Sequence, residues 1–85
     1  MIKAIKFYAD WCGPCRMYDR EWNKVVEKHK DEVEFQEINV ETDTSGLAAE
    51  YKVQSIPLTV VIKDGKEIKK TGLLTADVLT ELILN

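Results

Sequence analysis

Two cysteines separated by two residues are the feature of this sequence with the clearest chemistry. Cys12 and Cys15 follow a strand-like segment and precede a segment with helical spacing. A cysteine at a helix N-terminus lies beside unpaired N–H groups and the positive end of the helix dipole, and both lower its thiol pKa. We expect Cys12, at the exposed N-terminal edge, to attack a disulfide as thiolate. Cys15, one turn further along, would then resolve the mixed disulfide, so the spacing predicts dithiol–disulfide exchange.

The residues beside the cysteines suit this chemistry. Pro14 fits the first helical turn because its missing N–H would have had no partner there. Gly13 allows the backbone of a partner to approach closely. Trp11 offers a flat apolar surface next to the reactive sulfur. We therefore expect Trp11, Gly13 and Pro14 to support the site, and Trp11 also to contact substrate.

Half of a zinc site has the same cysteine spacing, so metal binding is an alternative. A mononuclear site needs two further ligands, and the only other obvious ligand, His29, lies about four helical turns from Cys15. A zinc ion or an iron–sulfur cluster shared between two chains stays open, but we assign no metal ligand. A structural disulfide is disfavoured, because a loop this short removes little entropy from the unfolded chain.

Length and composition limit the class of protein. The 85 residues, 45% hydrophobic and 32% charged, suit one globular domain over residues 1–85. A net charge of −3 with mixed signs disfavours a nucleic acid partner. No apolar run approaches the roughly 18–20 residues of a membrane span, and residues 1–6 do not resemble a signal peptide. We expect a cytoplasmic monomer that binds neither nucleic acid nor membrane.

Strand-like and helix-like segments alternate along the chain, which predicts an α/β fold of the order β-α-β-α-β-β-α. The first helix should bury Tyr18 and Trp22, and the last should begin at the N-cap Thr75. A parallel βαβ unit and an antiparallel hairpin at Asp64-Gly65 would form a mixed four-stranded sheet with helices on both faces. The expected strands are 2–9, 33–40, 58–63 and 66–72; the expected helices are 15–30, a short one from an N-cap at Asp43 or Ser45 to about 51, and a last one with Val78, Leu79, Leu82 and Ile83 on its apolar side.

Residues 9–17, Ala-Asp-Trp-Cys-Gly-Pro-Cys-Arg-Met, resemble the active-site segment of thioredoxins. Ile56-Pro57, the run Lys-Asp-Gly-Lys at 63–66 and Gly72 match further landmarks of the family in order and spacing. The resemblance covers essentially the whole chain and implies a thioredoxin-like fold. Because the chain starts at the strand before the cysteines, we expect it to lack the extra N-terminal strand and helix of full-length thioredoxins. It resembles short archaeal or phage-encoded forms, which are of glutaredoxin size.

The resemblance also implies a function and a set of contacts. It implies a protein-disulfide reductase with no bound cofactor, whose redox-active disulfide Cys12–Cys15 receives electrons from an NADPH-dependent flavin thioredoxin reductase. Its partners would be that reductase and disulfide-containing proteins. Ile56 and Pro57 would form a cis-proline loop that pairs with the substrate backbone beside the cysteines, and Gly72 would add to substrate binding.

One departure from the family concerns two charged residues. Members usually have a buried acid six residues before the first cysteine and a lysine opposite it on the next strand, whereas this chain has Lys6 and Glu37. Because an isolated buried charge is costly, we expect the two side chains to pair across the sheet beneath Cys15. Our hypothesis is that Glu37 or neutral Lys6 accepts the proton of Cys15. The alternative is that both side chains reach the sheet edge and stay in solvent.

Two other functions stay open at this point. A glutaredoxin-like reductase that works with glutathione would have a similar length and topology. Gly-Pro between the cysteines, rather than Pro-Tyr, favours the thioredoxin-like function. A binding subunit that docks on a partner enzyme through the loops around Trp11 and Pro57 is the third candidate.

Overall fold

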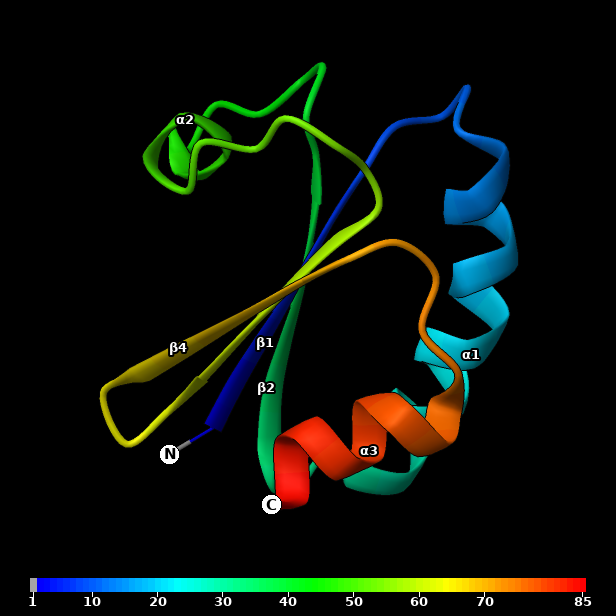
Figure 1. Ribbon diagram of the computed structural model, residues 1–85, viewed down its shortest axis with the longest axis vertical. Coiled ribbons are helices and arrows are strands. Elements are labelled where there is room, and N and C mark those ends of the chain that lie inside the picture. The colour runs from blue at the N-terminus through cyan, green and yellow to red at the C-terminus, as the bar shows by residue number, and fades with distance from the viewer. Residues whose placement is uncertain (1) are drawn as a thin grey trace.

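A mixed four-stranded sheet forms the centre of the molecule (Figure 1). The computed structural model describes residues 2–85, so Met1 of the predicted domain lies outside the described residues. The elements in chain order are β1 (Ile2–Tyr8), α1 (Gly13–His29), β2 (Val33–Asn39), α2 (Leu47–Glu50), β3 (Leu58–Lys63), β4 (Lys66–Thr71) and α3 (Ala76–Leu84). The sheet order is β2-β1-β3-β4, with β1 parallel to β2 and antiparallel to β3. The predicted α/β fold and element order are confirmed.

Strand β1 is buried on both sides because helices cover both faces of the sheet, as predicted (Figure 1). Helices α1 and α3 pack on one face, around a core that includes Ala4 of β1 and Trp22 of α1. On the opposite face, Ile5 and Phe7 belong to a second core, against which α2 packs. Alternation along β1 produces this division, because successive side chains of a strand point to opposite faces. The central strand is thereby fixed on the two sides, and its end carries the cysteine turn.

The last helix begins as predicted but presents a narrower apolar face. The hydroxyl of Thr75 accepts a hydrogen bond from Val78 N at 3.2 Å and caps α3. Leu79 and Ile83, four residues apart, are fully buried. Val78 is 43% exposed, so its predicted place on the apolar side is wrong. The reason is that neighbouring helical residues point about 100° apart, and the packing face is centred on Leu79 and Ile83.

The short helix α2 begins later than predicted. Its N-cap is Gly46 in a left-handed conformation (φ 83°), so the predicted N-cap at Asp43 or Ser45 is wrong. Both side chains nevertheless bind the first turn: Asp43 accepts from Ala48 N at 2.9 Å, and Ser45 accepts from Leu47 N at 3.2 Å. The hydrogen bonds from the Ser45 hydroxyl and from Ala48 N hold the pKa of Asp43 below its usual value.

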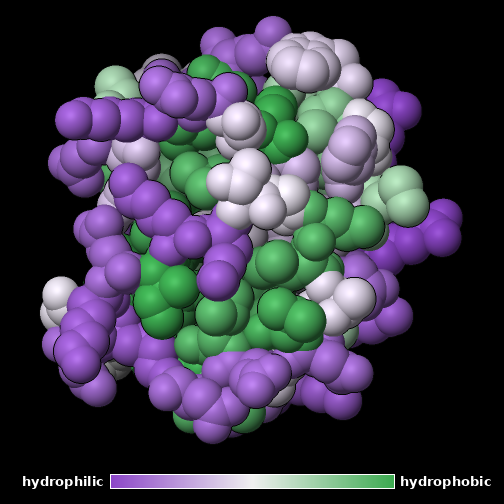
Figure 2. Space-filling view, in the orientation of Figure 1, coloured by the Kyte–Doolittle hydropathy of each residue, from purple (hydrophilic) through white to green (hydrophobic). Residues whose placement is uncertain are grey.

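The hairpin and the surface of the sheet complete the fold. Asp64 (φ 49°) and Gly65 (φ 83°) both adopt positive φ, which a two-residue hairpin turn requires, and β3 pairs with β4 as predicted. Figure 2 shows apolar side chains in the middle of this view, between β4 and α3, framed by hydrophilic ones. Ile68 of β4 and Leu82 of α3 are among the partly buried apolar residues that pack against the core. Within residues 2–85, no helix has the length and apolar character to cross a membrane.

Candidate functional site

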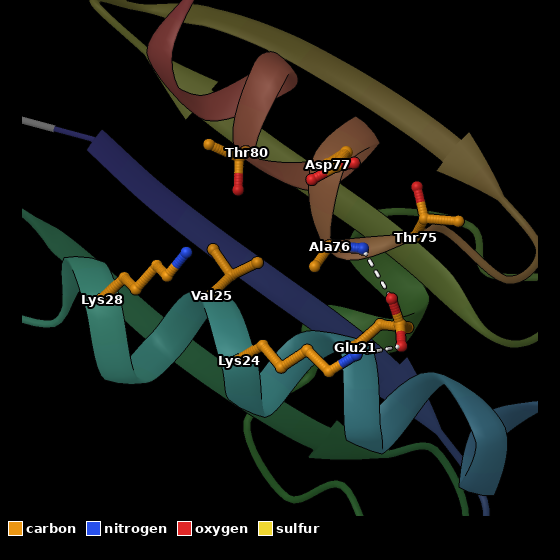
Figure 3. Close-up of a pocket in the computed structure, with 8 residues that line it drawn as sticks. All are labelled: Glu21, Lys24, Val25, Lys28, Thr75, Ala76, Asp77 and Thr80. Atoms are coloured by element: carbon orange, nitrogen blue, oxygen red, sulfur yellow. Dashed lines mark hydrogen bonds and ion pairs between the residues drawn. The ribbon is translucent and has the colours of Figure 1, made fainter.

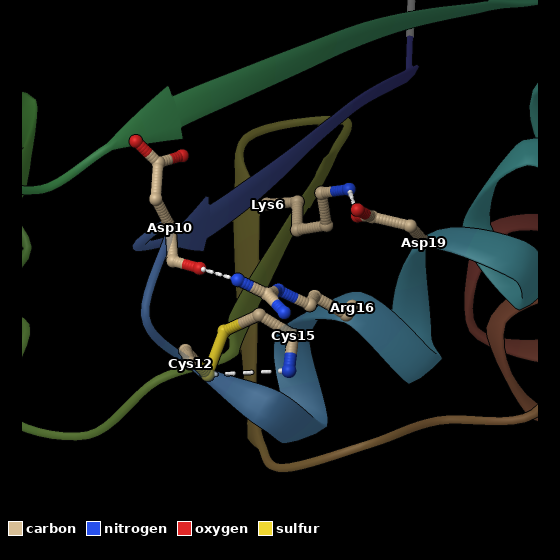
Figure 4. Close-up of a disulfide and its surroundings, with 6 residues drawn as sticks. All are labelled: Lys6, Asp10, Cys12, Cys15, Arg16 and Asp19. Atoms are coloured by element: carbon tan, nitrogen blue, oxygen red, sulfur yellow. Dashed lines mark hydrogen bonds and ion pairs between the residues drawn. A yellow bond between two sulfur atoms is a disulfide. The ribbon is translucent and has the colours of Figure 1, made fainter.

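The two cysteines form a disulfide where β1 turns into α1 (Figure 4). Cys12 is the N-cap of α1, and the helix starts at Gly13, two residues before the predicted start. Pro14 occupies the first turn, as predicted. The Cα atoms of Cys12 and Cys15 lie 5.2 Å apart, and Cys15 N donates a hydrogen bond to Cys12 Sγ at 3.2 Å. An N–H group directed at this sulfur stabilises a thiolate there once the bond is reduced.

Both sulfur-bearing residues are buried in this oxidised pair. Cys12 is 4% exposed and Cys15 2%, so the expectation of an exposed Cys12 is wrong for the disulfide form. The bond to Cys15 holds the Cys12 side chain against a small apolar cluster formed with Ala9, to which Ile56 also contributes. Trp11 is the large apolar side chain of this turn that reaches solvent, since it is 67% exposed. A partner therefore meets Trp11 before it meets the sulfur atoms.

The loop before β3 lies against the cysteines. Ile56 packs on the cluster that contains Cys12 and Cys15, and Pro57 is buried. The Ile56–Pro57 peptide bond is cis, which confirms the expectation from the family resemblance. Gly72 N donates to Pro57 O at 2.8 Å, and Gly72 has a positive φ of 94° that favours glycine. Of the four residues expected to bind substrate, Ile56, Pro57 and Gly72 are therefore linked to one another, with Ile56 in contact with the cysteine cluster.

Lys6 is fully buried between the sheet and α1. Its ammonium group makes ion pairs with Asp19 and with Glu37, the latter at 2.9 Å (Nζ to Oε1). Lys6 and Glu37 are register partners on β1 and β2, so the predicted pairing across the sheet is confirmed. The side chains of Asp19 and Glu37 are about half exposed, at 48% and 50%. Lys6 is therefore a buried cation whose two anions reach water, and the alternative in which both predicted residues stay in solvent is wrong for Lys6.

Aromatic rings surround the Lys6 ammonium group. It lies 5.3 Å from the centroid of Trp22, 5.6 Å from Tyr8 and 6.0 Å from Tyr18, distances at which cation–π attraction acts. The Tyr18 hydroxyl shares a 2.7 Å hydrogen bond with Thr59 Oγ1. Burial raises the pKa of Tyr18 to about 12, against the opposing effect of that hydrogen bond. Tyr18 therefore stays protonated near neutral pH, and its expected place in the core, like that of Trp22, is confirmed.

Sequence reasoning missed two residues of this site. Asp19 lies four residues after Cys15 and three before Trp22, so it shares the face of α1 that packs on the sheet; a charge on that face was the available signal. Arg16 Nη2 donates to the backbone oxygen of Asp10 at 2.9 Å and so closes the turn that carries Trp11 and Cys12 (Figure 4). Nothing in the sequence pattern marked that contact.

A metal ion held by the two cysteines, one of the alternatives above, would need further ligands. Within the described residues 2–85, no group of three or more His, Cys, Asp or Glu is arranged to hold a metal ion.

Glu21 on α1 accepts hydrogen bonds from Ala76 N at 2.9 Å and from Lys24 Nζ at 3.0 Å, and so ties α1 to the start of α3 (Figure 3). These bonds hold the pKa of Glu21 below its usual value, with the bond from Ala76 N as the main cause.

The sequence and the fold both match known proteins. The thioredoxin family model matches residues 2–85. Thioredoxin 1 of Synechococcus elongatus is 33% identical over 64 residues, which are 75% of this chain and 59% of that protein; a thioredoxin of Mycoplasmoides gallisepticum is 32% identical over 82 residues, 94% of this chain and 79% of that protein. The X-ray structure of Fasciola hepatica thioredoxin matches with a TM-score of 0.82 and 35% identity, covering 96% of this chain and 77% of that one.

The extent of these matches differs between the relatives. The chain spans 59% of the length of the Synechococcus thioredoxin and of two red algal thioredoxins, from Pyropia yezoensis and Porphyra purpurea. The family model nevertheless covers every residue that the structure describes. The matched residues include the cysteine pair at the start of α1 and the loop with the cis peptide bond before Pro57. They also form the four-stranded sheet. This chain belongs to the thioredoxin family.

Proposed function

We propose that this chain is a thiol–disulfide oxidoreductase that reduces disulfides in other proteins. The observation that carries the proposal is the Cys12–Cys15 disulfide at the N-terminus of α1, with Cys15 N directed at Cys12 Sγ. A sulfur that accepts an N–H bond at the positive end of a helix is stabilised as thiolate, which is the attacking species in disulfide exchange. Membership of the thioredoxin family supports the same activity.

The reaction proceeds in two exchanges that start from the reduced pair. The Cys12 thiolate attacks one sulfur of the substrate disulfide, the substrate S–S bond breaks, and one substrate thiolate leaves and takes up a proton. Cys15 then loses its proton and attacks Cys12 Sγ, which breaks the mixed disulfide and releases the second substrate thiol. Two electrons and two protons pass to the substrate, and the Cys12–Cys15 bond forms again.

The substrate chain would lie across the exposed end of the site. Trp11 provides the accessible apolar surface, and the small Gly13 with Pro14 leaves the start of α1 open to a partner backbone. Ile56 and Pro57 supply the opposite side, in the role that the family resemblance assigns to the cis-proline loop, and Gly72 adds to it from the segment after β4. These two exchanges use no metal ion bound to Cys12 or Cys15.

Electrons to restore the dithiol would come from an NADPH-dependent flavin thioredoxin reductase, and the site of action would be the cytoplasm. Family membership supports the first proposal. The second rests on the cysteines themselves, because a redox-active pair in place of a set of structural disulfides is typical of a reducing compartment. Thiol exchange with the reductase would use the same Cys12 sulfur as exchange with substrates.

Turnover of a protein disulfide tests the activity. With insulin as substrate and dithiothreitol as electron donor, we expect the chain to accelerate reduction far above the uncatalysed rate. NADPH with a thioredoxin reductase should replace dithiothreitol, whereas glutathione with glutathione reductase should support little turnover. Equal rates with glutathione would indicate the glutaredoxin-like alternative. If the chain does not accelerate insulin reduction by dithiothreitol, and a partner enzyme bound to the Cys12→Ser, Cys15→Ser chain keeps its full activity, the chain is a binding subunit.

We also propose that Lys6 and Glu37 support the site, and that Asp19 acts with them. Lys6 connects three elements, because it belongs to β1 and pairs with Asp19 of α1 and Glu37 of β2. Figure 4 shows its amine directed toward Asp19 and away from the disulfide, so this geometry favours a positioning role over direct proton transfer from Cys15. The ion pairs would hold the first two turns of α1, and with them Cys15, against the sheet.

Substitutions of the ion-paired residues test this support. Lys6→Met and Glu37→Gln should each slow insulin reduction several-fold, because each removes part of the connection between β1, α1 and β2. The double variant should lose less than the product of the single losses, since both remove the same interaction. The pH profile of the rate separates an effect at the cysteines from a general loss of stability. Single variants that match the parent in rate and pH profile would show that the pair has no part in the reaction.

A further inference from the structure

A groove lies beside the cysteine turn, between α1 and the segment that joins β4 to α3. Its volume is about 510 Å³, which is within the usual range of binding pockets. Met17 and Leu73, far apart in the sequence, both line it, and they are 62% and 45% exposed. Exposed apolar side chains that lie together in one patch mark sites where a protein contacts a partner. The complete lining is Arg16, Met17, Arg20, Glu21, Leu73 and Thr75.

The charged groups of the groove favour an acidic occupant. Arg16 is held at the turn by its hydrogen bond to Asp10 O, and Arg20 lies one helical turn further along α1. Among residues 2–85, neither arginine makes an ion pair. The carboxylate of Glu21 binds Ala76 N and Lys24 on the side toward α3 (Figure 3), so both of its oxygens already have partners. Arg16 uses one N–H group on a backbone oxygen and Arg20 has no acidic partner among the described residues, so both keep positive charge and N–H donors for an anionic ligand.

We propose that this groove docks an acidic, apolar segment of the protein whose disulfide the chain reduces. An apolar side chain of that segment would lie between Met17 and Leu73, and its carboxylates would bind Arg16 and Arg20. The planar guanidinium group binds a carboxylate through two parallel hydrogen bonds, which makes arginine well suited to this recognition. The inference rests on the proposed function and adds a class of substrate to it.

The position of the groove gives such docking an effect on the reaction. Arg16 directly follows Cys15 in the chain, so a segment bound in the groove lies next to the cysteine turn. Binding a substrate at a second contact turns the encounter of its disulfide with Cys12 into an intramolecular step, and so raises the effective concentration of that disulfide. Substrates with an acidic and apolar segment near their disulfide would therefore be reduced in preference to neutral ones.

Two disulfide-bonded peptides that differ only in this segment provide the substrates for the test. One carries Leu flanked by Asp and Glu near its disulfide, and the other carries Leu flanked by Asn and Gln. Arg20→Glu should lower kcat/KM for the acidic peptide about tenfold, mainly through KM, and change the neutral peptide by less than about twofold. Lys28→Glu is the control, because it makes the same change in net charge on α1 but lines the neighbouring cleft toward α3 (Figure 3).

The outcomes separate docking from long-range attraction and from the chemistry. If Arg20→Glu and Lys28→Glu lower kcat/KM for the acidic peptide equally, or if the parent does not prefer the acidic peptide, the docking proposal is wrong. Titration of the acidic peptide with its cysteines replaced by serine measures docking without exchange, and it should bind the parent more tightly than Arg20→Glu. If that difference is present while neither disulfide is reduced, the groove is a docking site and the proposed reductase function fails.

Discussion

Serine in place of Cys12 should reduce the rate of protein disulfide reduction to that of the uncatalysed reaction. A hydroxyl cannot form the mixed disulfide, and Cys15, the one cysteine that remains in this variant, lies inside the first turn of α1 and not at its N-cap. Cys15→Ser should behave differently. It leaves Cys12 at the N-cap of α1 to attack the substrate, but nothing then resolves the intermediate. The product should be a covalent complex of chain and substrate, which mass spectrometry would detect.

The reduced parent provides a second measurement of the same assignment. Near neutral pH, an alkylating reagent should label Cys12 first and Cys15 much more slowly, because the N-terminal position stabilises the Cys12 thiolate. Reduction also removes the bond that holds the Cys12 side chain against Cys15. Cys12 and Cys15 are buried to nearly the same extent in the disulfide form, so a difference in burial there does not account for a difference in labelling rate. Faster labelling of Cys15, or a covalent complex formed by Cys12→Ser, would reverse the assignment.

Replacement of Trp22 by alanine should have the largest effect on stability. Trp22 is fully buried, and its ring packs edge-on against Tyr18 at 5.9 Å and Phe35 at 5.4 Å between centroids. Removing a buried tryptophan costs about 3–5 kcal/mol. Small domains are stable by roughly 5–15 kcal/mol, so the variant should lose a large part of its free energy of unfolding. Urea denaturation should show a strongly lowered midpoint, or a chain already unfolded without urea.

Trp22→Phe is the matched control for that experiment. It retains an aromatic ring beside Tyr18 and Phe35, and it removes the indole N–H, which has no hydrogen-bond partner among the described residues. Removing an unpaired buried donor removes its desolvation cost, which offsets part of the free energy lost with the smaller ring. We therefore expect a much smaller drop in the urea midpoint than for Trp22→Ala. A drop as large as that of Trp22→Ala would mean that the indole nitrogen, or the full size of the ring, is essential to the packing.

Much of this protein could be predicted from local patterns in its sequence. The spacing of Cys12 and Cys15 before a helical pattern was sufficient to place the disulfide at the start of α1, because a strand, a turn and a helix are short-range structures. Asp64-Gly65 was sufficient for the hairpin, since both residues adopt positive φ at low cost. The pairing of Lys6 with Glu37 followed from the alternation of two neighbouring strands and from the cost of an isolated buried charge.

Other features depended on contacts between segments that are far apart in the chain. The burial of Cys12 follows from its contacts with Ala9 and Ile56, and the exposure of Val78 from how α3 is rotated on the sheet. Asp19 belongs to the site because α1 packs with that face on β1, which brings its carboxylate to the ammonium group of Lys6. The groove between Met17 and Leu73 exists because α1 and the segment after β4 meet in space. Local sequence determines which elements form, whereas side-chain packing between elements determines which residues become neighbours.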